Sequence, residues 1–145
     1  MIHLVLDAST AIDWFVLTPE GEGYSRHLTT LAAAGQVRFS VPLHFDVEVT
    51  GYLVKKHRQR PAEFTQKWLD EALMTLDALR IDIVGQGFNF ALLGKLAQSY
   101  GLSGYDVPYF QLAREMDIPI ASRDRGIAAA CRTWHVERWT PVTTS

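Results

Sequence analysis

Four acidic residues in this chain of 145 residues each follow a short apolar run or open a helical pattern. They are Asp7 in VLDAS, Glu48 in FDVEVTGYLVKK, Asp106 in GLSGYDVPYFQLA and Asp124 in IPIASRDRGIAAA. A carboxylate at the end of a buried strand loses its hydration, which is costly unless another group compensates. If the fold brings all four together, their repulsion requires a cation or shared protons. The pattern therefore predicts a divalent-metal site.

The types of donor favour a hard cation. Carboxylates without neighbouring histidine or cysteine suit Mg²⁺ or Mn²⁺. The five histidines show no zinc-ligand spacing, and the single cysteine, Cys131, is expected to be a buried structural thiol. The chain also lacks a glycine-rich phosphate loop and a G-x-S-x-G elbow, so the commonest nucleotide-binding and hydrolase motifs are absent.

Short apolar strands alternate with helical patterns along the chain. Strands are expected at 2–6, 38–41, 81–84, 118–121 and 136–139, and helices at 8–18, 24–34, 44–57, 61–79, 88–100, 105–116 and 125–133, with a turn at 21–23. This alternation predicts a single α/β domain over residues 1–145, with three layers and a central, mostly parallel sheet flanked by helices. Ligands of such folds bind beyond the carboxyl ends of the strands, where the four acids could meet.

Composition sets the protein class. The chain is 48% hydrophobic and 21% charged with a net charge of −2, as in ordinary globular proteins, and no overall basic field marks a nucleic-acid binder. One cysteine permits no internal disulfide, which favours a reducing compartment. The first apolar run stops at Asp7, well short of a signal core or a membrane span. We therefore expect a cytoplasmic protein without membrane contact.

Four motifs together resemble the PIN-domain family, and closely the VapC-type ribonuclease toxins of type II toxin–antitoxin systems. VLDAST is similar to the family's first motif, and PLHFDVEVTGYL is similar to the second, an acid early in a helix. The most specific resemblance is that of the stretch YDVPYFQLAREMDIPIASRDRGIAAAC. It is similar to a family pattern in which a helix that begins with Tyr-Asp is followed by a strand that ends in a small hydroxyl residue, with an Asp two positions later. Two positions depart from the family pattern: Gly51 stands where the family usually has Asn, and Val107-Pro108 stands where it more typically has Ala followed by a variable residue. Both departures affect positioning, but neither removes a carboxylate.

The resemblance implies a Mg²⁺-dependent endoribonuclease that hydrolyses phosphodiester bonds in structured RNA and is blocked by a cognate antitoxin. It implies Asp7, Asp106 and Asp124 as metal ligands, and Glu48 as a fourth catalytic acid that acts through a water or a second metal. Ser9 and Ser122 would support a ligand or bind phosphate. The basic residues expected to contact RNA are Lys55, Lys56, Arg58, Arg123 and Arg125. A homodimer is expected through helices such as Thr65–Leu79.

Several alternatives stay open. An acid at a helix start commonly caps that helix, and a basic helix end is commonly solvated. Asp13, Asp46, Asp77 and Asp117 are expected to be solvated or capping residues. For function, the alternative is a PIN-like module that binds RNA or a partner without cleaving. A phosphatase with Asp7 as nucleophile is disfavoured, because Ser9 stands where that chemistry uses a second acid.

Overall fold

The computed structural model describes residues 1–141, and its core is a parallel sheet. The strands are β1 (Ile2–Leu6), β2 (Val37–Pro42), β3 (Ile81–Val84) and β4 (Ile120–Ala121), in the order β3-β2-β1-β4. β1 pairs with β2 from Ile2 opposite Val37, and with β4 through Leu6 opposite Ala121. All pairs are parallel, so the carboxyl ends of the strands lie at one edge.

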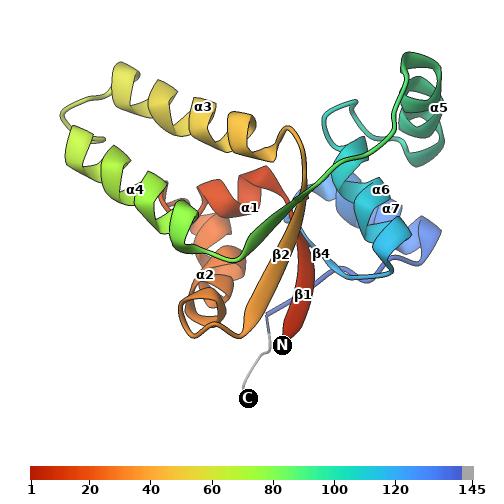
Figure 1. Ribbon diagram of the computed structural model, residues 1–145, viewed down its shortest axis with the longest axis horizontal. Coiled ribbons are helices and arrows are strands. Elements are labelled where there is room, and N and C mark those ends of the chain that lie inside the picture. Colours follow the sequence, from red (N-terminus) through yellow and green to blue (C-terminus); the bar gives the residue numbers. More distant parts are fainter. Residues whose placement is uncertain (142–145) are drawn as a thin grey trace.

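Helices cover this sheet on both faces, which confirms the predicted three-layer α/β fold (Figure 1). They are α1 (Ala8–Ile12), α2 (Pro19–Ala33), α3 (Phe45–Gln59), α4 (Gln66–Ala78), α5 (Phe90–Tyr100), α6 (Val107–Met116) and α7 (Arg125–Trp134). Figure 1 shows α3 and α4 as a hairpin projecting to one side, with α5, α6 and α7 on the other. Among residues 1–141, no helix combines the length and apolarity that a membrane crossing requires.

The central strands are apolar because helices bury both of their faces. Leu4, Val5 and Leu6 of β1 are fully buried, as is Phe39 of β2. Neighbouring residues of a strand point to opposite faces, so complete burial of three in a row requires cover on both sides. Cys131 is also buried, as predicted, and burial raises the pKa of its thiol to about 11.

The segment between β1 and α2 differs from the prediction. α1 ends at Ile12, and the predicted turn at 21–23 lies inside α2. Thr18 explains the early start of α2, because its Oγ1 accepts a hydrogen bond from the N–H of Gly21 at 3.1 Å. Pro19 at the next position is also favourable in a first helical turn. Cap and proline together outweigh the low helix propensity of the glycines.

Two other boundaries are corrected. α4 begins at Gln66 instead of Pro61, because the Thr65 hydroxyl caps it by accepting from the N–H of Trp68 at 3.1 Å. The expected last strand, 136–139, is reduced to a single parallel bridge between Ile120 and Arg138. By contrast, α5 ends as predicted at Gly101, whose φ of 66° is the left-handed conformation that glycine adopts readily.

Candidate metal centre

The sheet brings the predicted acids to its carboxyl edge. Asp7 follows β1 directly, and its N–H donates to the carbonyl of Ala121 at the end of β4. Asp124 lies three residues after the end of that neighbouring strand, at the N-cap of α7. Glu48 lies in the first turn of α3, just after β2, and Asp106 is the N-cap residue of α6, which packs on β1 and β2. The four acids therefore come from four separate segments to one edge.

Asp7 is the most buried of the four, with 4% of its surface exposed. Its Oδ2 accepts hydrogen bonds from Ser122 Oγ at 2.7 Å and Ser9 Oγ at 2.8 Å. The Ser122 hydroxyl also accepts from the N–H of Asp124 at 3.1 Å. Both predicted hydroxyl residues therefore contact the central carboxylate, and Ser122 links it to a second acid.

The acids interact electrostatically. Burial, with smaller contributions from the charges of Asp106 and Asp124, raises the pKa of Asp7 to about 6, against the lowering effect of the two serine hydroxyls. Burial also raises the pKa of Glu48 to about 7, with further contributions from Asp7 and Asp106. The pKa of Asp106 is raised by burial and by Asp124. The carboxylates of Asp7, Glu48 and Asp106 therefore lie in an electrostatic environment that disfavours the ionisation of all three at once.

Helix capping explains only one of these acids. Asp124 Oδ2 accepts from the N–H of Ile127 at 2.9 Å and caps α7. Asp7 and Asp106 occupy the corresponding positions before α1 and α6, but neither side chain makes a capping hydrogen bond. Within residues 1–141, no Lys or Arg forms an ion pair with any of these three carboxylates. The placement of Asp7 and Asp106 at the sheet edge therefore needs a reason other than helix capping.

Tyr109 and His44 border Glu48 and were not predicted as site residues. The Tyr109 hydroxyl and the Glu48 carboxylate interact, yet within the described chain neither Tyr109 Oη nor the buried Glu48 Oε2 completes a hydrogen bond of normal geometry. His44 Nε2 lies 3.7 Å from Glu48 Oε2, and its ring packs on Tyr109 with a centroid distance of 5.0 Å. Sequence spacing could have indicated His44, which lies four residues before Glu48, whereas the contact of Tyr109 with Glu48 joins two helices that are far apart in the sequence.

The carboxylate oxygens are the type of ligand that a hard divalent cation prefers, but in the part of the chain that the structure describes they do not form a complete coordination site. In residues 1–141, no three Asp, Glu, His or Cys side chains are grouped closely enough to hold one ion. Asp124 is engaged with α7, and Asp7 directs Oδ2 to the serines. Glu48 Oε2 is buried and accepts no hydrogen bond in the described chain. A bound ligand that donates to this oxygen or coordinates it would offset the cost of its burial. Shared coordination of one ion would therefore require side-chain movement at this edge.

The basic residues predicted to contact RNA are dispersed. Lys55, Lys56 and Arg58 lie in the second half of α3, toward the tip of the α3–α4 hairpin (Figure 1). At about 1.5 Å per residue, Lys55 is roughly 10 Å along the helix from Glu48. Arg125 is exposed beside Asp124.

Arg123 makes an ion pair within the fold. It bonds to Asp13 through Nε at 2.6 Å and through Nη2 at 2.7 Å. The expectation that Asp13 is solvated or capping is therefore wrong, because Asp13 is 6% exposed and paired. Asp46, Asp77 and Asp117 are exposed, in agreement with the prediction.

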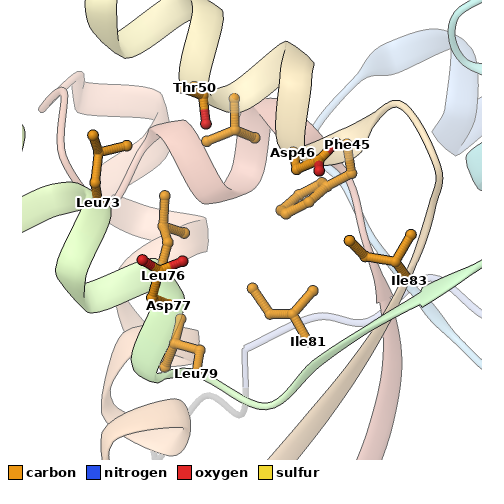
Figure 2. Close-up of a pocket in the computed structure, with 10 residues that line it drawn as sticks. Phe45, Asp46, Thr50, Leu73, Leu76, Asp77, Leu79, Ile81 and Ile83 are labelled. Carbon is orange, nitrogen blue, oxygen red and sulfur yellow. The ribbon is translucent and has the colours of Figure 1, made fainter.

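An apolar groove of about 400 Å³ lies between α3, α4 and β3, apart from the four acids. Figure 2 shows Leu73, Leu76 and Leu79 facing Ile81 and Ile83 across it, with Phe45 at one end. Its charged lining residues are both acidic, Asp46 and Asp77. Ile83 is 49% exposed, so apolar surface is open to solvent here. The groove has the character of a protein contact rather than of a catalytic pocket.

Comparisons with known proteins show the fold alone. No protein-family model matches the chain, and no curated protein matches it. Among solved structures, the chain is similar to PAE2754 from Pyrobaculum aerophilum, with a TM-score of 0.61 and 15% sequence identity. The match covers 89% of this chain and 84% of that one.

Proposed function

We propose that this protein is a Mg²⁺- or Mn²⁺-dependent endoribonuclease, the toxin of a toxin–antitoxin pair with a PIN-like domain. The observation that carries the proposal is the placement of four carboxylates, Asp7, Glu48, Asp106 and Asp124, at one edge of the sheet without a Lys or Arg partner in the described chain. Besides burial, Asp106 and Asp124 raise the pKa of Asp7, and Asp7 and Asp106 raise the pKa of Glu48. A divalent cation would remove this repulsion, and the donor set is the one such a cation prefers.

Asp7, Asp106 and Asp124 would hold the ion. When bound, the ion would supply positive charge to a phosphate oxygen and acidify a water for attack. Ser9 and Ser122 hold the Asp7 carboxylate in one orientation by donating to its Oδ2. A ligand oriented in this way loses less entropy on binding a metal.

Glu48 would handle the proton of the attacking water. Its pKa of about 7 suits a general base, because such a group is partly ionised near neutral pH and still accepts a proton. The neighbouring Tyr109 hydroxyl stays protonated, since burial and the charges of Glu48, Asp7 and Asp106 raise its pKa. It would therefore act as a donor that orients the Glu48 carboxylate.

RNA cleavage tests this proposal. Purified protein is incubated with structured RNA with Mg²⁺, with Mn²⁺ or with EDTA, and the Asp7→Asn variant is the comparison. We expect metal-dependent cleavage that the variant loses by a factor of at least about 100. Undiminished cleavage by Asp7→Asn contradicts the assignment. Metal-independent RNA binding without turnover would support the alternative, a non-cleaving RNA- or partner-binding module.

The protein partners are part of the same proposal. We propose that the groove between α3, α4 and β3 accepts an apolar antitoxin segment that carries a Lys or Arg, because its charged rim consists of Asp46 and Asp77. Co-purification with the product of a small adjacent reading frame tests this, and Ile83→Lys should prevent it. Co-purification that survives Ile83→Lys contradicts this docking site. The proposed homodimer, through α4, is tested separately by sedimentation.

A further inference from the structure

The segment 122–124 carries two candidate site residues, Ser122 and Asp124, with Arg123 between them. Arg123 donates from Nε to Asp13 Oδ2 at 2.6 Å and from Nη2 to Asp13 Oδ1 at 2.7 Å. Two parallel bonds of this kind fix the guanidinium in both distance and orientation. Asp13 is the residue after the last one of α1. The ion pair therefore joins the connection between β4 and α7 to the C-terminal end of α1.

Helix α2 closes over the same carboxylate. Ser25 Oγ donates to Asp13 Oδ2 at 2.7 Å. A Cβ atom at Gly21 would lie 2.5 Å from Asp13 Cγ, which is closer than real Cβ atoms approach another atom. Gly21 is buried, whereas Gly23 on the same helix has no atom within 4 Å of the corresponding position. Asp13 is thus enclosed by an element that requires a glycine at one particular position.

The backbone of Ser122 is held by side chains as well. Its N–H donates to Tyr24 Oη at 3.0 Å, and its carbonyl accepts from Arg138 Nε at 2.8 Å. These contacts are needed because β4 has only two residues, and so short a ladder constrains the following loop weakly. The hydroxyl of Ser122 then reaches Asp7 at 2.7 Å. The loop geometry that serves the acids therefore depends on contacts made outside the site.

We propose that the Asp13–Arg123 pair positions Ser122 and Asp124 for metal binding, so that Asp13 and Arg123 are positioning residues of the candidate centre. The pair acts through the backbone on either side of Arg123 and does not itself bind the ion. The inference rests on the proposed metal-dependent function. In this arrangement the Arg123 guanidinium binds Asp13 and is not available to RNA phosphates. Gly21 contributes to the site because it leaves room for the Asp13 side chain.

Three variants separate positioning from general stability. Asp13→Asn with Arg123→Met removes the pair without leaving an unpaired buried charge, which a single substitution would do. Gly21→Ala displaces Asp13 while changing no charge. Gly23→Ala is the matched control, because it adds the same methyl group to the same helix in open space. The probe is Mn²⁺ alone, titrated by electron paramagnetic resonance well below the melting temperature of each variant, which is also measured.

We expect the double variant to bind Mn²⁺ about 10-fold more weakly than wild type, as for other residues that orient metal ligands. Gly21→Ala should weaken binding in the same direction, and Gly23→Ala should leave it unchanged. Affinities of the double variant and of Gly21→Ala within twofold of wild type overturn the inference, even if their melting temperatures fall. If only Gly21→Ala folds, its affinity alone decides. A wild-type protein that binds no Mn²⁺ refutes the proposed function itself, and the inference with it.

Discussion

Replacing Asp7 by Asn should stabilise the metal-free protein and remove most of the stabilisation that metal gives to wild type. The asparagine side chain has nearly the same shape, and its carbonyl oxygen can still accept from Ser9 and Ser122 at the position of Oδ2. What the substitution removes is the buried negative charge. Burial and the nearby acids make that charge unfavourable in the absence of a cation.

The size of the effect follows from the pKa of Asp7. The pKa of Asp7 is about 6 in the folded protein, against 3.8 for an unperturbed Asp. The ionised Asp7 side chain therefore lowers the free energy of unfolding by about 3 kcal/mol. Because the folded state binds this proton more tightly than the unfolded state, metal-free stability falls as the pH rises from about 4 to about 6. Above about pH 6 the full cost is present. Asp7→Asn should therefore gain about 1 to 3 kcal/mol at pH 8, or about 3 to 10 °C in melting temperature.

Thermal unfolding in EDTA at pH 8 and at pH 4.5, and again with saturating Mg²⁺ at pH 8, measures this directly. Ligand at 100 times its dissociation constant stabilises by about 2.7 kcal/mol, so wild type should gain in Mg²⁺ while the variant gains little. Asp46→Asn is the control, since Asp46 is exposed and its replacement should change stability by no more than about 0.5 kcal/mol. An Asp7→Asn variant that is no more stable than wild type at pH 8 in EDTA would refute the reasoning.

Three further predictions concern the same carboxylates. Mn²⁺ affinity should fall as the pH drops from about 7 to below 6, because Glu48 and Asp7 protonate in that range; a flat pH profile of the dissociation constant contradicts it. Ser122→Ala removes a hydrogen bond that lowers the pKa of Asp7, so the midpoint of that profile should move to higher pH, and an unchanged midpoint argues against the contact. Tyr109→Phe should change stability by less than about 1 kcal/mol, because the hydroxyl has no well-formed hydrogen bond, but should lower kcat several-fold; equal kcat values would show that it does not orient Glu48.

The sequence predicted the layers of the fold and the placement of Asp7 and Asp124 after neighbouring strands. Continuous apolar runs such as 2–6 predict strands buried on both faces, and the parallel arrangement places Asp7 and Asp124 at one edge. Helix ends with a clear signal, such as Gly101, were also predicted. These features depend on residues close together in the chain, which is why they can be read from the sequence.

Features that depend on distant contacts were not predictable. Gly21 looks like a turn residue until Asp13 is seen packed against it. Asp13 looks solvated until Arg123, far along the chain, is found to pair with it. The proximity of Tyr109 to Glu48 likewise depends on how α6 and α3 meet at the sheet edge.

The central claim is that one divalent cation joins carboxylates from separate segments of the chain. A crystal structure of the protein grown with Mn²⁺, with anomalous differences measured, tests it most directly. We predict an anomalous peak bounded by carboxylate oxygens of Asp7, Asp106 and Asp124, at about 2.0 to 2.6 Å or through a bridging water. Well-ordered crystals at millimolar Mn²⁺ and pH 8 that show these three side chains without an ion between them would contradict it.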